Sequence, residues 1–174
     1  MKNPFYPDAW VDSTYEIDFE QYYKEGYRAV IFDIDNTLVP HGAPATKEAA
    51  AFFASLRETG FSTCLLSNNQ KPRVAPFADA VGSIYIENAH KPSVKNYQEA
   101  CRRMGIKEEQ AVFVGDQLFT DVYGAKRTGL YNILTEPINP KEEIQIVLKR
   151  YLEHIVLFFY ERDLARGRIT KKNS

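Results

Sequence analysis

Ten residues, 30–39 (VIFDIDNTLV), constrain the fold most, because an apolar, β-prone run stops there at two carboxylates, Asp33 and Asp35. An unpaired charge inside a buried strand has a prohibitive free-energy cost. At the carboxyl end of a strand, by contrast, a side chain can face the crevice in which open α/β sheets bind ligands. The stretch therefore predicts a buried strand over residues 28–33 that ends at a functional site.

Strand and helix patterns alternate along the rest of the chain. Further strands are expected at 61–66, 83–86, 111–114 and 130–134, and helices at 18–24, 46–60, 71–80, 93–105, 120–129 and 140–164. Continuously apolar strands are typical of parallel sheets that are covered on both faces. This order predicts an α/β fold of three layers, a Rossmann-like, doubly wound parallel sheet.

The length of 174 residues fits one domain and leaves little room for a second. We divide the chain into an N-terminal aromatic arm (1–27) packed on the core, a core (28–140), a C-terminal amphipathic helix (141–166) and a basic tail (167–174). An alternative for the arm is that Trp10 and several tyrosines lie at a membrane surface, where amphipathic rings are favoured.

Composition narrows the class of partner and the compartment. The net charge of −1 argues against a nucleic-acid-binding protein. The two cysteines form no disulfide framework or metal motif, and Cys64 lies in an apolar run, which suits a reducing compartment. No secretory signal and no run of 18 apolar residues is recognisable, so we expect a cytoplasmic protein without a transmembrane helix.

Polar side chains follow four of the predicted strands. They are Asp33 with Asp35, Ser67 with Asn68, Lys91, and Asp116 with Asp121. The carboxyl ends of parallel strands lie along one edge of a sheet, so we expect these side chains to converge. Carboxylates suit Mg²⁺, and a lysine with a hydroxyl suits phosphate. Together they indicate Mg²⁺-assisted phosphoryl transfer.

The same stretches resemble the motifs of the haloacid dehalogenase-like (HAD) phosphatases. Residues 33–37 (DIDNT) resemble the first motif, Ser67 the second, Lys91 the third and residues 115–121 (GDQLFTD) the fourth. All four motifs come in the family's order, each at the end of a predicted strand. The likeness spans about residues 27–134 and implies the HAD phosphatase core.

The resemblance implies a role for each motif residue. Asp33 is the nucleophile that forms an aspartyl phosphate, and Asp35 protonates the leaving oxygen and then deprotonates the attacking water. Ser67, with Asn68 beside it, donates hydrogen bonds to the phosphoryl oxygens. Lys91 offsets the charge of the phosphate and of the nucleophile.

The resemblance also implies a Mg²⁺ site. Its ligands are Asp33, the backbone carbonyl of Asp35, and Asp116, with Asp121 ordering the metal's shell through water. Asp121 could instead stabilise a helix dipole. His41 and His90 lie close to the motifs in sequence. We interpret His90 as a loop residue and include neither histidine in the catalytic set, and the sequence does not decide their roles.

Many HAD enzymes cover the site with a cap domain, and this chain has no room for one. Residues 39–45 make a short loop, and residues 69–90 are used up by one helix and one strand. An uncapped site admits bulky substrates such as a lipid head group or a macromolecule. A small uncapped enzyme can also use a second copy of itself as a lid.

The C-terminal helix is the second guide to the substrate. Residues 154–160 (HIVLFFY) are apolar on all sides of a helix, and basic residues flank them. This pattern is typical of an interfacial helix on an anionic membrane. It predicts a protein that can bind peripherally to the inner face of the membrane. The alternative is a core helix that also forms a homo-oligomer surface.

A narrower resemblance is to the YqeG-like branch of the family, which includes the phosphatidylglycerophosphate phosphatases of mitochondria and chloroplasts. Residues 26–40, 67–69, 90–92 and 115–121 carry it. It implies dephosphorylation of phosphatidylglycerophosphate, a phospholipid head group, to phosphatidylglycerol. Two alternatives remain: a capless HAD phosphatase for a soluble or macromolecular phosphate, and a receiver-like signalling module that stores a phosphoaspartate without hydrolysing it.

Overall fold

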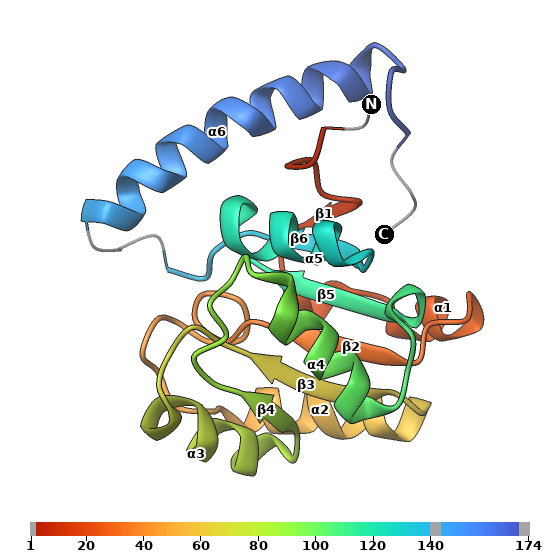
Figure 1. The fold of residues 1–174 in the computed structure, drawn as a ribbon, viewed down its shortest axis with the longest axis vertical. Coiled ribbons are helices and arrows are strands. Elements are labelled where there is room, and N and C mark those ends of the chain that lie inside the picture. Colours follow the sequence, from red (N-terminus) through yellow and green to blue (C-terminus); the bar gives the residue numbers. More distant parts are fainter. Residues whose placement is uncertain (1–2, 140–143, 171–174) are drawn as a thin grey trace.

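The computed structural model describes residues 3–139 and 144–170. Six strands form one parallel sheet in the order β1-β6-β5-β2-β3-β4 (Figure 1). The strands are β1 (Ala9–Val11), β2 (Ala29–Phe32), β3 (Ser62–Leu66), β4 (Ile84–Ile86), β5 (Ala111–Gly115) and β6 (Tyr131–Thr135).

Within the described residues, five α-helices and three shorter helical turns connect these strands, and a sixth α-helix follows β6. The α-helices are α1 (Phe19–Lys24), α2 (Lys47–Thr59), α3 (Lys71–Val81), α4 (Val94–Met104), α5 (Tyr123–Thr128) and α6 (Ile144–Ala165). The short turns are η1 (Thr14–Glu16), η2 (Glu108–Gln110) and the π-helical η3 (Leu118–Val122).

Helices cover both faces of the sheet. Successive side chains of β2 point to opposite faces, and all of them are apolar, so both faces need cover. Val30 and Phe32 point into a core with α1, α2 and α3, whereas Ala29 and Ile31 point into a second core with α4 and α5. All four side chains are fully buried, which explains why this strand is apolar without alternation. The predicted three-layer, doubly wound fold is confirmed.

Most predicted helix ends agree with the structure to within one or two residues. At the start of α2, the Thr46 side chain accepts a hydrogen bond from Ala49 N at 3.0 Å. At its end, Gly60 adopts φ +109°, a left-handed conformation that glycine reaches without a steric penalty. Ser93 stands at the N-terminal cap position of α4, although its side chain makes no capping hydrogen bond.

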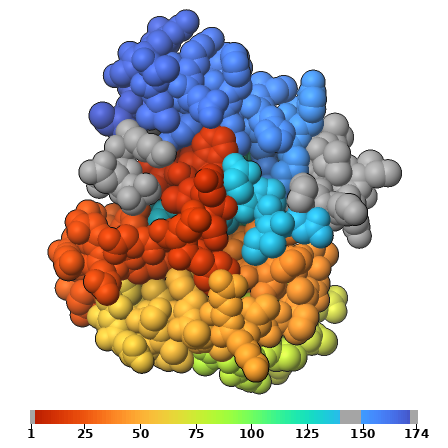
Figure 2. Space-filling model, turned by 180° about the vertical axis from the view of Figure 1, so that it is seen from behind, coloured from red at the N-terminus to blue at the C-terminus, as the bar shows by residue number. Residues whose placement is uncertain are grey.

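The N-terminal arm contributes a strand that the sequence analysis did not assign. β1 extends the sheet at its edge, with Ala9 opposite Ile133 and Val11 opposite Thr135. Three residues are too few to show a periodic pattern, and the pairing partner lies more than a hundred residues away. In Figure 2 this red segment lies between the blue C-terminal helix and the orange and yellow part of the core.

The helix expected to begin at Thr120 or Asp121 begins earlier, so that prediction was wrong. Leu118 opens η3, a wide π-turn that runs directly into α5. Thr120 and Asp121 lie inside this turn, and Asp121 Oδ2 accepts a hydrogen bond from Gln117 N at 3.1 Å. The wide turn therefore directs Asp121 back toward the end of β5. Such π-turns are frequent at functional sites.

Helix α6 crosses the β1 edge of the sheet (Figure 1). It is described from Ile144, so the predicted start at residue 140 lies outside the described residues. On its inner face Leu157 and Tyr160 are buried, and Leu157 packs with Leu118 and Leu134. On the outer face the helix exposes large apolar side chains, namely Tyr151, Leu152, Ile155, Phe158 and Phe159. None of the helices described is long and apolar enough to cross a membrane.

The register of the central strands brings the motif residues to one edge. Phe32 lies opposite both Leu65 and Val114, so the residues that follow these three strands are neighbours. Asp33 N continues the ladder with a 3.0 Å hydrogen bond to Val114 O. No domain is inserted above this edge, because residues 40–46 form a loop that leads into α2 and residues 70–90 form α3 and β4.

Candidate active site

A small cavity opens at the carboxyl ends of β2, β3 and β5. Its volume is about 90 Å³. The lining residues are Asp33, Asp35, Asn36, His41, Ser67, Asn68, Asn69, Lys91, Gln117 and Thr120. All four motifs predicted from the sequence are represented here, and the structure brings them together from segments that are far apart in the chain.

A buried lysine joins two of the carboxylates. Lys91 Nζ lies 2.7 Å from Asp33 Oδ1 and 2.7 Å from Asp121 Oδ1. The three side chains are at most 9% exposed. Charges at this depth interact through a medium of low dielectric constant, so the ion pairs are strong and the cost of leaving any one unpaired is high.

Asp116 completes an acidic cluster. Its Oδ1 accepts a hydrogen bond from Thr37 Oγ1 at 3.2 Å, and Arg150 of α6 pairs with its Oδ2. Carboxylate oxygens of Asp33, Asp116 and Asp121 all lie within 4.8 Å of one another. The site thus concentrates negative charge that two cations, Lys91 and Arg150, only partly offset.

The pKa values reflect this crowding. Burial, opposed by Lys91 and reinforced by Asp121, raises the pKa of Asp33 from 3.8 to about 6. Burial and the carboxylates of Asp121 and Asp33 hold the pKa of Asp116 well above its ordinary value. Burial disfavours the charged form of Lys91, but its two carboxylate partners outweigh burial and raise its pKa, so the lysine stays protonated.

The donor set fits a divalent metal ion. Three buried carboxylates within 4.8 Å of one another offer the oxygen ligands that hard cations prefer. Gly115 makes room for one of them, because a Cβ at this position would lie 2.4 Å from Asp121 Oδ2. The carboxylate of Asp35 is not part of the cluster.

The Asp35 carboxylate is held by three donors on the other side of the cavity. Its Oδ2 accepts a hydrogen bond from Asn69 Nδ2 at 2.6 Å. Its Oδ1 accepts one from Gly42 N at 2.8 Å and forms an ion pair with Arg73 Nη2 at 2.8 Å. Asp33 and Asp35 therefore face different partners, although only one residue separates them.

The two polar residues after β3 have different surroundings. Ser67 is fully buried, and its Oγ accepts a hydrogen bond from Asn69 N at 3.2 Å. Asn68 holds the Lys91 backbone at both ends, with Lys91 N donating to its Oδ1 at 2.7 Å and its Nδ2 donating to Lys91 O at 3.4 Å. Of the two histidines near the motifs, exposed His41 lines the cavity and exposed His90 does not.

Sequence reasoning missed four contacts of this site: Asn69, Arg73, Arg150 and Glu153. Glu153 is buried and accepts a hydrogen bond from Leu118 N at 2.9 Å, and it also pairs with Arg150 at 3.2 Å. The two residues thus link α6 to the π-turn. Their three-residue spacing on a helix was the only available signal, and such pairs are common on surface helices.

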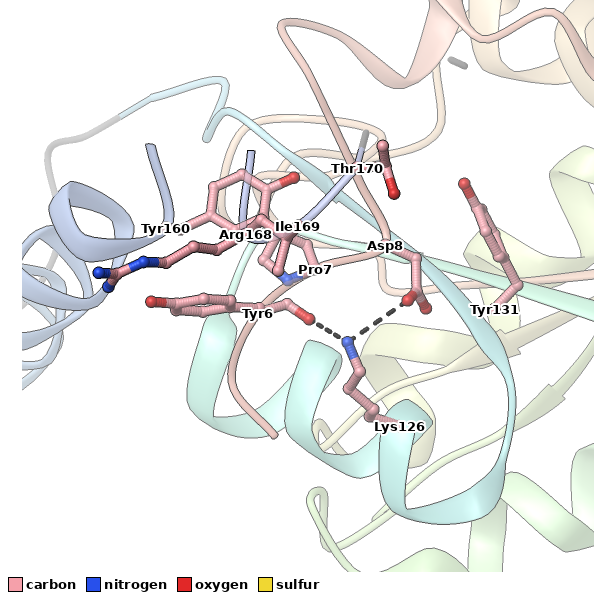
Figure 3. A pocket seen from close by; sticks show the side chains of 9 residues that line it. All are labelled: Tyr6, Pro7, Asp8, Lys126, Tyr131, Tyr160, Arg168, Ile169 and Thr170. Carbon is pink, nitrogen blue, oxygen red and sulfur yellow. Dashed lines mark hydrogen bonds and ion pairs between the residues drawn. The ribbon is translucent and has the colours of Figure 1, made fainter. Parts of the chain in front are cut away.

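A larger pocket of about 340 Å³ lies at the other end of the sheet, before the first residues of β1 and β6. Figure 3 shows its lining, in which Lys126 donates to the Tyr6 carbonyl and pairs with Asp8. Three tyrosines surround that pair. The pocket has a single carboxylate and none of the motif residues, so we place the candidate site at the smaller, acidic cavity.

This chain was compared with the models of protein families. Residues 41–129 match the model of the haloacid dehalogenase-like hydrolases. The matched segment covers about half of the chain and runs from the loop after the first motif to the end of α5.

Two relatives match along nearly the whole chain. The protein named probable phosphatase YqeG from Bacillus subtilis is 34% identical over 163 residues, which are 93% of this chain and 95% of that protein. The chloroplastic/mitochondrial phosphatidylglycerophosphate phosphatase 1 of Arabidopsis thaliana is 27% identical over 171 residues, which cover 92% of this chain but only 49% of the plant protein.

Solved structures agree on the fold. An uncharacterised protein from Listeria monocytogenes serotype 4b superposes with a TM-score of 0.54 at 19% identity. The match covers 67% of this chain and 84% of that protein. At this level of identity the likeness concerns the architecture alone.

Proposed function

This chain belongs to the haloacid dehalogenase-like hydrolases and is a phosphatase of that family, and we propose that its substrate is phosphatidylglycerophosphate. The reaction would release inorganic phosphate and leave phosphatidylglycerol. Mg²⁺ is the proposed metal, with Asp33, Asp116 and the Asp35 backbone carbonyl as ligands and Asp121 behind them. The observation that carries the chemistry is the buried ion pair between Asp33 and Lys91 at the floor of an open cavity.

In the proposed mechanism, Asp33 attacks the phosphorus, and the bond from phosphorus to the ester oxygen breaks. Asp35 gives its proton to that oxygen, so the alcohol leaves neutral. Asp35 then takes a proton from water, whose oxygen attacks the phosphorus of the aspartyl phosphate and regenerates Asp33. Lys91 and Ser67 stabilise the charge on the phosphoryl oxygens. A bound Mg²⁺ would neutralise charge on the phosphoryl group and orient it for attack.

Two observations support a lipid substrate. The plant phosphatidylglycerophosphate phosphatase matches 92% of this chain, and no cap covers the cavity, so a head group could enter while its acyl chains stay in a membrane. The match covers only half of the plant protein, so the proposed substrate is supported by the resemblance and the open site together and not by the match alone.

The outer face of α6 is the proposed membrane contact. Tyr151, Ile155 and Phe158 are exposed along one stripe of the helix. Exposed basic residues, Lys149 before the stripe and Arg166 and Arg168 after it, would attract anionic lipids. A helix of this kind lies in the interface with its apolar face buried. The proposed location is therefore the inner membrane face.

A phosphate-release assay with Mg²⁺ tests the substrate. Phosphatidylglycerophosphate in mixed micelles is compared with soluble phosphate monoesters, with Asp33→Asn as the inactive control. We expect the lipid to be turned over at least tenfold more efficiently, on the order of 1.4 kcal/mol or more of extra transition-state stabilisation. Efficient turnover of soluble phosphates without activity on the lipid would contradict the proposal that phosphatidylglycerophosphate is the substrate.

Flotation with liposomes tests the membrane contact. Vesicles of phosphatidylcholine with phosphatidylglycerol should carry the protein to the top of the gradient, and Phe158→Ser should weaken that binding. Vesicles of phosphatidylcholine alone should bind less. If the protein floats with neither kind of vesicle, α6 is not a membrane contact.

A further inference from the structure

We propose that Arg73 binds a second anionic group of the substrate, next to the phosphate that is cleaved. This inference rests on the proposed function and assigns the part of the site that would read a phosphodiester, or another phosphate, on the leaving group. Arg73 is half-buried in the first turn of α3, and its ion-pair partner is Asp35, which lies outside the acidic cluster. It therefore belongs to the wall of the site and not to its floor.

The position of Arg73 relative to Asp35 places it on the side of the leaving group. Its Nη2 lies 2.8 Å from Asp35 Oδ1, and Asp35 is the residue proposed to protonate the leaving oxygen. Atoms attached to that oxygen must pass close to Asp35 when the proton is transferred. The next charged group of the substrate would then lie within reach of the guanidinium.

A hollow beside the cavity offers the space. It measures about 490 Å³, against about 90 Å³ for the catalytic cavity. Its lining residues are Asn68, Asn69, Gln70, Pro72, Arg73 and Asn88. Asn68 and Asn69 line both spaces, so the two lie next to each other.

The chemistry of this hollow suits an anion. Its lining contains four side-chain amides and one guanidinium but no carboxylate. The guanidinium presents donors in a planar fork that matches two oxygens of a phosphate. The wall thus offers hydrogen-bond donors and positive charge, whereas the neighbouring floor is strongly acidic. The phosphate to be cleaved would lie at the floor, and the second anionic group would lie at the wall.

The present hydrogen bonds of Arg73 leave it free to serve a ligand. Its Nε is buried and has no hydrogen-bond partner within residues 3–139 and 144–170. A buried donor without an acceptor is unfavourable, so a small rotation toward a phosphate would gain a bond. Asp35 would keep Asn69 and Gly42 as donors during such a rotation, so the proposed acid would stay in place.

The test compares two soluble phosphates that differ in one group. Glycerol 3-phosphate carries only the phosphate to be cleaved, whereas deacylated phosphatidylglycerophosphate carries the same group and a phosphodiester. Phosphatidylglycerophosphate in mixed micelles forms a third arm that separates the head group from the lipid. The measured quantity is the ratio of kcat/KM for the phosphodiester-bearing substrate to that for glycerol 3-phosphate, in wild type and in Arg73→Met.

We expect wild type to prefer the phosphodiester-bearing substrate, and Arg73→Met to lower the ratio at least tenfold, mainly through KM. Using a ratio cancels any common effect of losing the contact with Asp35. Lys71→Met, which removes an exposed charge from the same turn, should keep the wild-type ratio. A ratio unchanged in Arg73→Met, or lowered equally by Lys71→Met, would overturn the inference.

A second measurement separates this inference from the proposed function. The deacylated head group should inhibit hydrolysis of p-nitrophenyl phosphate more strongly than glycerol 3-phosphate does, and Arg73→Met should abolish that difference. If the lipid is not hydrolysed but this inhibition depends on Arg73, the result contradicts the proposed substrate and supports the role of Arg73 in binding. If the lipid is hydrolysed and inhibition is the same in Arg73→Met, the binding role fails and the substrate stands.

Discussion

Lys91 Nζ lies 2.7 Å from Asp33 Oδ1, and this buried contact defines the charge state of the site. The same nitrogen lies 2.7 Å from Asp121 Oδ1, so one cation serves two carboxylates. A carboxylate oxygen of Asp116 lies within 4.8 Å of those of Asp33 and Asp121, and Arg150 is its cationic partner among the described residues. The cluster therefore has more negative than positive charge until a metal ion binds, and several measurable properties follow.

The first prediction concerns Asp33→Asn. The substitution removes the proposed nucleophile, so we expect kcat to fall at least about 10,000-fold, which is the upper end of the roughly 10²–10⁴ that a single proton-transfer group supplies. The metal-free variant should nevertheless be more stable than wild type at pH 8. Burial raises the pKa of Asp33 to about 6, so ionisation of this group at pH 8 opposes folding by about 2–3 kcal/mol.

The direction of the pH dependence follows from the raised pKa. Between about pH 4 and 6 the folded protein holds a proton on Asp33 that the unfolded chain has lost. The free energy of unfolding should therefore fall as the pH rises through this range. Urea denaturation at pH 5 and pH 8 in the presence of EDTA measures this change in the free energy of unfolding. Asp79→Asn, at an exposed position, is the matched control. Equal pH dependence in wild type and Asp33→Asn would contradict the assignment.

The second prediction concerns metal binding. Mg²⁺ should raise the melting temperature, and the increase should be larger at pH 8 than at pH 5. At pH 5 the raised pKa values of Asp33 and Asp116 keep protons on these two proposed ligands, and the metal must displace those protons. Differential scanning fluorimetry over a range of Mg²⁺ concentrations measures the shift. Asp121→Asn should reduce it, and a shift that is independent of pH would argue against the acidic cluster as the site.

The third prediction concerns Lys91→Met. This change leaves two buried carboxylates without their cation, so we expect a loss of about 3–5 kcal/mol in the free energy of unfolding at pH 8. The loss should be smaller at pH 5, where the carboxylates can take up protons. Chemical denaturation at both pH values measures the difference, with exposed Lys95→Met as control. A loss below about 1 kcal/mol would be typical of a surface ion pair and would contradict the buried one.

The fold and the floor of the site were predictable because each depends on local sequence. A buried strand that ends in carboxylates identifies Asp33 and Asp35, and the same pattern at other strands identifies Ser67 and Asp116. The walls of the site depend on where helices pack. Arg73 lies in the first turn of α3 and Glu153 in the middle of α6, and neither position has a local pattern that differs from an ordinary helix surface.

The fourth prediction uses Gly115, whose missing side chain makes room for Asp121, the residue proposed to stand behind the Mg²⁺ ligands. In Gly115→Ala the new Cβ would lie 2.4 Å from Asp121 Oδ2, and Asp121 is 1% exposed and has no space to retreat. We expect a loss of about 1–3 kcal/mol in stability, as for overpacked cores, and weaker Mg²⁺ binding by calorimetry. Asp121→Asn is the control for lost carboxylate charge without added volume. Wild-type Mg²⁺ affinity in Gly115→Ala would show that this close approach does not position Asp121 for metal binding.

The last prediction is that Arg150 holds α6 on the catalytic domain. Its guanidinium pairs with buried Asp116 and, at 3.2 Å, with Glu153, which in turn accepts a hydrogen bond from Leu118 N. Arg150→Met should release this end of the helix and lower the free energy of unfolding by about 1–3 kcal/mol.

The measurement uses the one tryptophan of the chain, Trp10, which packs in the same apolar cluster as Leu157 of α6. Its fluorescence therefore reports on the helix. We expect a red shift in Arg150→Met and none in Arg166→Met, because Arg166 is exposed near the far end. An unchanged spectrum together with wild-type amide exchange in α6 would mean that the apolar contacts alone hold the helix.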